Sequence, residues 1–231
     1  MKNKIWRCSA FILINALAFV ALAMVATGHA MAAAPTRISC VGDSITAGAG
    51  VPASTAWPMV LQHLLGKKYK VKNFGVSGTT MLKHSDYTYW GTPQFKQAQA
   101  FKPNVVIIML GTNDTKPWNW KNAKEFPADY KAMVRRFESL PSKPQIFVCL
   151  PPPVIRGGNY GINEENLFFG VIPDILRVAK DLHLPVINIH YWMLGQPGLL
   201  QGDGVHPNVQ GQAFLAKVIA AKLKKVWGTI K

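Results

Sequence analysis

Five short apolar runs along the chain have the composition of β-strands, and their arrangement constrains the fold more than any other feature. The run NVVIIMLG at 104–111 is apolar throughout, which is typical of a strand buried on both faces of a parallel sheet. Helical stretches separate the runs, as crossovers between parallel strands require. The sequence therefore predicts an α/β fold: a three-layer α/β/α sandwich around a five-stranded, mostly parallel sheet. The expected strands are 36–42, 69–75, 104–111, 144–151 and 184–190.

The expected helices lie between and after these strands, at 55–65, 125–140 and 164–182. Pro173 falls inside the third of them and predicts a kink or a division there, because proline removes a helical hydrogen bond. Pro207 is expected to open a last helix that runs to about Trp227, since proline is favoured at the first helical position.

Residues 1–34 have the layout of a secretory signal peptide. A basic start precedes an apolar run from Ala10 to Ala26, and the small residues TGHAMAAA follow. We expect cleavage among residues 30–34, which leaves 35–231 as one domain exported to a periplasm or secreted, without stable membrane insertion. The alternative is an uncleaved membrane anchor, since the apolar run nearly reaches spanning length.

The chain is basic, with 26 Lys and Arg against 11 Asp and Glu. The lysines are scattered, which favours a solvated basic surface over a nucleic-acid site and leaves an acidic glycan or envelope partner as the alternative. Cys40 and Cys149 each lie in a strand-like run and are expected to be unpaired small hydrophobes. The chain contains neither CxxC nor HExxH, so no metal site is predicted.

Four polar, glycine-rich segments each follow a predicted strand. They are GDSITAG from Gly42, GVSGTT from Gly75, GTND from Gly111 and, after a loop, DGVHPN from Asp203. Right-handed crossovers bring the carboxyl ends of parallel strands to one edge of the sheet, where ligands of such sheets bind. We therefore expect the four segments to meet in one site.

The residue types in these segments match the parts of a serine hydrolase. Ser44 is the candidate nucleophile, with helix capping as its structural alternative. His206 is the candidate general base, and Asp203, three residues earlier, would hold its other ring nitrogen. Gly78 and Asn113 are candidate donors to a developing oxyanion; otherwise they are turn residues.

The four segments, in this order, resemble the GDSL esterases, also called SGNH hydrolases. Isoleucine replaces the leucine of the name-giving motif at position 45. The resemblance implies a flavodoxin-like fold, a Ser-His-Asp triad completed by Asp203, an oxyanion hole that includes the Ser44 N–H, and no cofactor. The four signature residues of that family fall on Ser44, Gly78, Asn113 and His206.

Within that superfamily the chain is most similar to carbohydrate O-acetylesterases, particularly the sialate type, in NFGVSGTTML, IIMLGTNDTKPWNW and DGVHPN. The resemblance implies hydrolysis of acetyl esters on a carbohydrate such as sialic acid or a polysaccharide, an acidic one included. The candidate substrate-binding residues are Asp43, Trp90, Trp118, Trp120 and Arg156.

Two other functions stay open. A lysophospholipase, thioesterase or arylesterase would use the same chemistry on a lipid-like ester. A non-catalytic glycan-binding module would keep the fold, although it would not need Ser44, Asn113, Asp203 and His206 together. A phosphate- or nucleotide-binding protein is disfavoured, because the chain lacks a G-x-G-x-x-G motif after its first strand and a P-loop.

Overall fold

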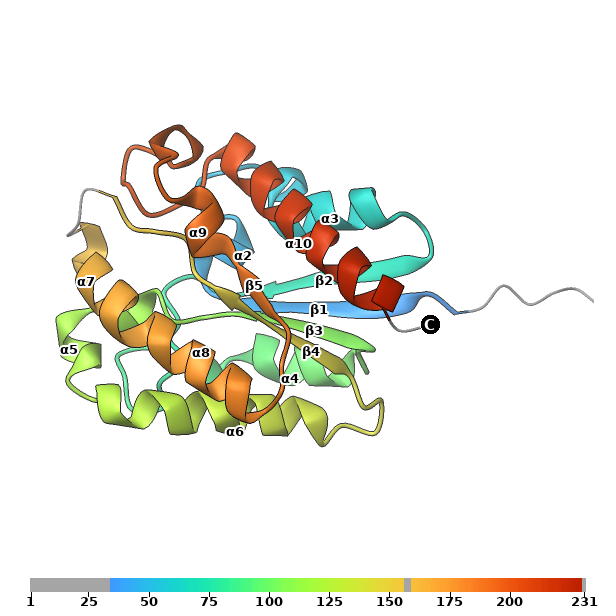
Figure 1. Cartoon of the computed structure of the whole chain (residues 1–231), viewed down its shortest axis with the longest axis horizontal. Coiled ribbons are helices and arrows are strands. Elements are labelled where there is room, and N and C mark those ends of the chain that lie inside the picture. The colour runs from blue at the N-terminus through green and yellow to red at the C-terminus, as the bar shows by residue number, and fades with distance from the viewer. Residues whose placement is uncertain (1–33, 156–158, 230–231) are drawn as a thin grey trace, which may run out of the picture. The chain divides into compact units, whose positions relative to one another are not determined.

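Five parallel strands form one sheet in the order β2-β1-β3-β4-β5 (Figure 1). The computed structural model describes residues 34–155 and 159–229; the predicted signal segment, apart from Ala34, and Arg156 lie outside them. This strand order is that of a flavodoxin-like doubly wound sheet, so the predicted α/β fold is confirmed. The strands are β1 Thr36–Gly42, β2 Tyr69–Gly75, β3 Val105–Met109, β4 Gln145–Leu150 and β5 Val186–Asn188.

Helices cover both faces of the sheet, which gives the three layers (Figure 1). Because successive strand residues point to opposite faces, Ile107 and Ile108 of β3 enter two different cores. One core lies under α3 and α10, and the other under α4, α6 and α8. The bounds of these helices are α3 Trp57–Leu65, α4 Pro93–Ala100, α6 Phe126–Glu138, α8 Ile172–Asp181 and α10 Val209–Thr229.

The last strand is shorter than the sequence predicts. β5 ends at Asn188, whose side-chain oxygen accepts a hydrogen bond from the Tyr191 N–H at 2.9 Å and caps helix α9 (Ile189–Met193). The expected strand over 184–190 is therefore wrong beyond Asn188, because an N-cap ends the extended conformation.

The segment 164–182 is divided, as its proline predicts. Helix α7 (Glu164–Asn166) leads into a π-helical turn, Leu167–Val171, and α8 begins directly after that turn. Pro173 lies in the first turn of α8, where the missing N–H costs no helical hydrogen bond.

The last helix begins two residues later than expected. Asn208, not Pro207, precedes the helix, and its side-chain oxygen accepts from the Gly211 N–H at 3.0 Å. Pro207 instead lies in an antiparallel bridge with Leu200. The side-chain cap on Asn208 therefore determined where α10 starts.

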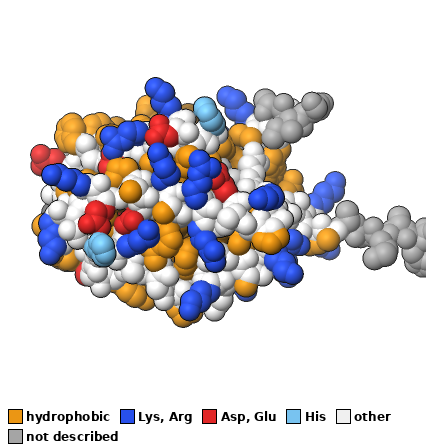
Figure 2. All heavy atoms as spheres, turned by 90° about the horizontal axis from the view of Figure 1, so that it is seen from below, with side chains coloured by type: hydrophobic (Ala, Val, Ile, Leu, Met, Phe, Trp, Pro, Cys, Tyr) orange, Lys and Arg blue, Asp and Glu red, His pale blue; other side chains and the backbone are white. Residues whose placement is uncertain are grey.

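The surface and the cysteines agree with the composition. Figure 2 shows Lys and Arg side chains dispersed over one face with apolar side chains between them. Cys40 and Cys149 are buried and unpaired, as predicted. Across residues 34–155 and 159–229, no helix combines the length and the apolarity needed to cross a bilayer.

Candidate active site

The candidate site lies at the carboxyl edge of the sheet, beside its topological switch point. β1 is flanked by β2 and β3, and its last residue, Gly42, lies opposite both Gly75 and Met109. The chain leaves β1 and β3 in opposite directions at this point, which opens a crevice outside the strand ends. Ser44, directly after β1, begins the short helix α2 (Ser44–Ala47).

The turn after β1 is tight and holds the Ser44 side chain away from the helix end. A Cβ on Gly42 would lie 2.7 Å from the Met109 carbonyl oxygen, so glycine is required. The Asp43 carboxylate caps α2 by accepting from the Ile45 N–H at 2.9 Å. Capping therefore falls to Asp43, and the Ser44 hydroxyl, on a side chain only 8% exposed overall, is available for another partner.

That partner is His206. The Nε2 atom of His206 lies 2.8 Å from the Ser44 Oγ, and its Nδ1 lies 2.7 Å from the Asp203 Oδ2. A carboxylate only accepts hydrogen bonds, so Nδ1 carries the proton and Nε2 accepts from the Ser44 hydroxyl. Ser44, His206 and Asp203 thus form a continuous hydrogen-bonded series.

Asp203 is held in its ionised form. Partial burial raises the pKa of Asp203, but hydrogen bonds from the His206 ring and from the backbone N–H groups of His206 and Val205 outweigh that effect and leave the pKa below its usual value. The charged carboxylate therefore persists beside the imidazole over the neutral and mildly acidic range.

Gly78 and Asn113 lie on the loops after β2 and β3. Gly78 has φ +83°, a left-handed conformation that favours glycine. The Asn113 side-chain amide donates to the Thr79 carbonyl at 3.1 Å and so joins the two loops. An amide has two N–H groups, which leaves one to donate elsewhere.

Two buried carboxyl groups lie next to these elements, Asp43 in the turn after β1 and Asp114 in the loop after β3. Asp114 accepts from the backbone N–H groups of Met81 and Leu82 at 2.9 and 2.7 Å. Burial raises the pKa of Asp114 to about 7 and the pKa of Asp43 to about 6, against the lowering effect of their backbone hydrogen bonds. Asp114 is thus close to half-protonated near neutral pH, whereas Asp43 reaches half-protonation only near pH 6.

Most of the predicted substrate-binding residues do not face the site. The Asp43 side chain is buried in its capping role. Trp90 donates to the Met81 carbonyl at 2.9 Å and packs on the core, and Trp120 packs edge-on against Phe126. Among the described members of the set, only Trp118 is exposed, at 50%.

Two exposed tyrosines near the site are not in the predicted substrate-binding set. The Tyr160 ring lies edge-on to the His206 ring, with a centroid distance of 5.8 Å. The Cδ1 atom of Tyr87 lies 3.7 Å from where a Cβ on Gly78 would stand. The aromatic run YTYW at 87–90 was a signal for Tyr87, whereas nothing in the loop around Tyr160 indicates its contact with His206.

Trp118 is held in place by a polar network that also escaped sequence analysis. Its indole N–H donates to Asp86 at 2.8 Å. Asp86 also accepts from the Asn119 amide at 2.8 Å and lies 3.6 Å from the Lys116 ammonium. The ring of Trp118 abuts Gly161, where a Cβ would meet it at 2.5 Å.

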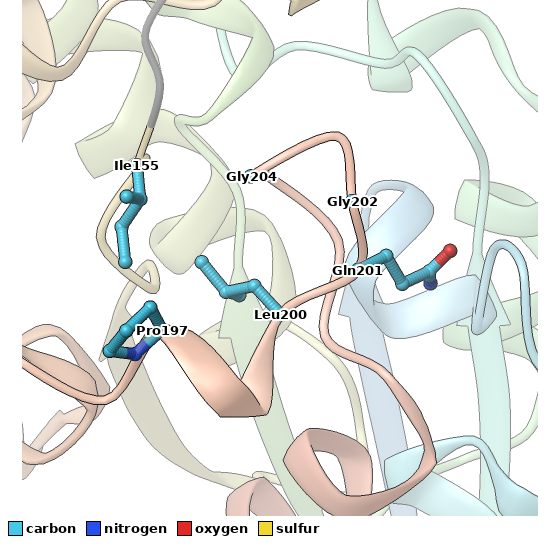
Figure 3. A pocket seen from close by; sticks show the side chains of 6 residues that line it. All are labelled: Ile155, Pro197, Leu200, Gln201, Gly202 and Gly204. Carbon is cyan, nitrogen blue, oxygen red and sulfur yellow. The ribbon is translucent and has the colours of Figure 1, made fainter.

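A small hollow lies beside the loop that carries Asp203 (Figure 3). The backbone of Ile155, after β4, donates to the Gly204 carbonyl at 2.8 Å and joins the two loops there. This hydrogen bond fixes the Asp203 loop against the end of β4. The hollow is lined by Ile155, Pro197, Leu200, Gln201, Gly202 and Gly204.

A flavodoxin-like sheet with a serine hydroxyl, an imidazole and a carboxylate in series at its carboxyl edge is the framework of a carboxylic ester hydrolase. The chain belongs to the GDSL-like Lipase/Acylhydrolase family, whose profile matches residues 40–214. The predicted resemblance is therefore confirmed, and the protein is an ester hydrolase of the GDSL type.

Known relatives carry several ester-hydrolase names. An acetylxylan esterase of Xylanibacter ruminicola is 38% identical over 207 residues, which cover 81% of this chain and 43% of that protein. The thioesterase 1/protease 1/lysophospholipase L1 of Escherichia coli is 27% identical over 195 residues, which cover 84% of this chain and 86% of that protein. The solved structure of the acetyl xylan esterase AlAXEase superposes with a TM-score of 0.63 at 20% identity, over 80% of this chain and 98% of that chain. This similarity supports the fold.

Proposed function

We propose that this protein is an exported serine esterase that removes acetyl groups from a carbohydrate. The observation that carries the proposal is the series from the Ser44 hydroxyl through His206 to Asp203, with contacts of 2.8 and 2.7 Å. In the proposal, residues 1–34 direct export to a periplasm or the exterior, and 35–231 form the catalytic domain.

In the proposed reaction, the Ser44 oxygen attacks the acetyl carbonyl while His206 takes the hydroxyl proton on Nε2. Asp203 stabilises the imidazolium that forms and keeps Nδ1 oriented. The imidazolium then returns the proton to the leaving sugar hydroxyl, which leaves acetyl-Ser44. Water, activated by the same imidazole, hydrolyses this ester and restores the serine.

The oxyanion of the tetrahedral intermediate would be stabilised by three donors: the N–H groups of Ser44 and Gly78 and the free amide hydrogen of Asn113. Ser44 begins α2, so its N–H has no acceptor within the helix. The left-handed turn at Gly78 leaves its N–H without a hydrogen bond inside the described chain. Donors of this kind are each worth about 10²–10³ in kcat.

A carbohydrate substrate is supported by the aromatic rim of the site, which consists of Tyr87, Trp118 and Tyr160. All three side chains are exposed. Tyr87 lies beside Gly78, Trp118 beside Gly161, and Tyr160 beside His206. Flat rings with polar tips pack against sugar faces and hydrogen-bond their hydroxyls. The acetylxylan esterase relative favours an acetylated polysaccharide over acetylated sialic acid as the first substrate to try.

A lipid-like ester is the second candidate substrate, and the Escherichia coli relative, named both thioesterase and lysophospholipase, favours it. The two candidates differ in the length of acyl chain that the site must hold. Hydrolysis of p-nitrophenyl acetate and p-nitrophenyl octanoate therefore separates them.

The test compares these two esters, acetylated xylan and O-acetylated sialic acid, using the wild type, Ser44→Ala and the control Ser139→Ala. Ser139 is exposed, and among the described residues its hydroxyl bonds only the Arg136 carbonyl, so its variant should keep full activity. We expect acetate and at least one acetylated sugar to be hydrolysed, and Ser44→Ala to lose the activity. Preference for octanoate would favour the lipid-ester candidate. A folded wild type that hydrolyses none of the four would leave a glycan-binding module.

A further inference from the structure

Helix α9 lies at the open edge of the sheet, and its surroundings expose more large apolar side chains than a solvated surface needs. We call this set the α9 face. Its exposed fractions range from 47% to 74%. Ring contacts occur in two pairs: the Phe168 ring lies 5.0 Å from the Phe169 ring and 5.7 Å from the His190 ring of α9, and the Tyr191 and Trp192 rings lie 5.4 Å apart. The α9 face consists of Phe168, Phe169, Tyr191, Trp192 and Leu194.

A groove of about 580 Å³ continues this face between β5, α9 and α10. Figure 1 shows α9 and α10 beside β5, the strand at the edge of the sheet. No carboxylate is among the described residues that line the groove. The apolar lining is Val186, Ile187, Trp192, Phe214, Val218 and Ala221, and the polar lining is Asn188, Lys217, Lys222 and Lys225.

The three lysines all lie on α10 and line the groove. At a rise of about 1.5 Å per residue, positions 217 to 225 span roughly 12 Å along the helix. An apolar groove bordered by several ammonium groups is complementary to a surface that is apolar inside and anionic outside. A patch of exposed aromatic and aliphatic side chains of this kind marks an interaction site.

We propose that the α9 face and its lysine-bordered groove dock the protein on an anionic lipid surface. Trp and Tyr favour the headgroup level of a bilayer, where one end of the ring is apolar and the other is wet. Phe169 and Leu194, which have no polar atoms on their side chains, would enter the acyl boundary. The lysines would lie over anionic headgroups.

Two other occupants fit these observations less well. A polysaccharide would be met by rings with polar tips, and phenyl and leucyl side chains such as Phe169 and Leu194 offer it no hydrogen bond. In a two-fold dimer through this face, the same patch meets itself. Lys217 and Lys222 of the two copies would then face one another and repel. Each chain already carries a formal net charge of +15, which adds to the repulsion.

The test uses residues 35–231, so that the apolar segment 10–26 does not contribute to lipid binding. This part forms one compact unit, and all described core residues of both cores fall within it. The protein is sedimented with vesicles of phosphatidylcholine alone and of phosphatidylcholine mixed with phosphatidylglycerol. We expect binding to the mixed vesicles, weakened by salt because exposed charges are screened within about 10 Å at 0.1 M.

Two variants test the two halves of the face. Lys217→Glu/Lys222→Glu should lower partitioning onto the mixed vesicles by more than tenfold, since one lysine near an anionic surface contributes about fivefold. Trp192→Ala should lower partitioning severalfold, including at high salt, where the charge contribution is screened. The matched controls are Lys67→Glu/Lys70→Glu and Leu64→Ala, which change exposed side chains on and after α3.

Every variant is checked for an unchanged circular dichroism spectrum and melting temperature, so the test does not depend on esterase activity. Equal binding to both kinds of vesicle by wild type and variants, or no binding at all, would overturn the proposal. Dimerisation in light scattering that Trp192→Ala abolishes would assign the face to a second copy. Binding to a uronic-acid polysaccharide but not to vesicles would assign it to a glycan.

Discussion

At the scale of single residues, the position of Ser44 depends on its neighbour. A serine after a strand commonly caps the helix that follows, and a capping side chain is oriented toward the backbone N–H groups of the first helical turn. Here Asp43 accepts from the Ile45 N–H, and Ser44 Oγ lies 2.8 Å from His206 instead. Asp43 is therefore a positioning residue of the proposed mechanism rather than the substrate contact that the sequence suggests.

Asn113→Ala tests the proposed oxyanion hole at this scale. We expect kcat for p-nitrophenyl acetate to fall by about 10²–10³ with little change in KM, because the bond to the oxyanion forms in the transition state. The control is Asn122→Ala, which loses only an exposed hydrogen bond to the His84 carbonyl. A change confined to KM would mean that Asn113 binds the substrate, and a drop in melting temperature would mean that its bond to Thr79 is mainly structural.

The sequence predicts the polar residues of the site better than the aromatic ones. Ser44, Asp203 and His206 sit in glycine-containing segments after strands, and parallel topology sends those segments to one edge. The aromatic side chains depend on side-chain contacts between distant loops. Trp118 points outward because Asp86, 32 residues away, accepts from its indole, and no local pattern encodes that bond.

At the scale of elements, most boundaries follow from apolar patterns, and the errors occur where a side chain caps a helix. β1 and β2 match the predicted ranges. β5 and α10 deviate because the side chains of Asn188 and Asn208 each accept from the backbone N–H group three residues ahead. Helix α4 was not predicted at all: its sequence, PQFKQAQA, places only Phe95 and Ala98 in the core.

Asn208→Ala tests the start of α10. The Asn208 side chain accepts from the Gly211 N–H and donates to the carbonyls of Gly198 and Leu200, so it holds the helix and the preceding loop together. We expect a loss of about 1–2 kcal/mol in the free energy of unfolding, measured with urea. Asn208→Asp keeps the cap but not the two donors and should fall in between. Equal stability of all three proteins would show that the cap contributes nothing.

At the scale of the whole molecule, the site is supported from both layers of helices. Gln212, on α10, accepts from the Trp57 N–H of α3 at 2.8 Å and donates to the Ile45 carbonyl of α2 at 3.2 Å. On the opposite side, Asp114 holds the loop after β2 through two backbone N–H groups. The position of Ser44 thus depends on the same contacts that stabilise the fold. The protonation of the buried carboxyl groups therefore bears on the geometry of the site and on the free energy of unfolding.

The pH dependence of stability tests the protonation of Asp43 in the folded state. Burial raises the pKa of Asp43 to about 6. A raised folded-state pKa means that the folded protein holds a proton that the unfolded chain releases. The resulting stabilisation is complete below the unfolded pKa of about 3.9 and is lost as pH rises through about 6. The loss amounts to roughly 3 kcal/mol for a shift of this size.

Asp43→Asn cannot ionise, and its Oδ1 can still accept from the Ile45 N–H. We therefore expect the variant to lose less stability than the wild type between about pH 4 and about pH 8, measured by urea unfolding at each pH. Asp114 stays in both proteins and gives each a further loss of stability toward higher pH. This loss is smaller in the variant, because the charge of Asp43 contributes to the raised pKa of Asp114. The control is Asp181→Asn, which removes an exposed carboxylate on the surface of α8. Its free energy of unfolding should change between the two pH values as the wild type's does, apart from the small effect of the lost ion pair with Lys131. If Asp43→Asn follows the wild type throughout, Asp43 is ionised in the folded protein over this pH range.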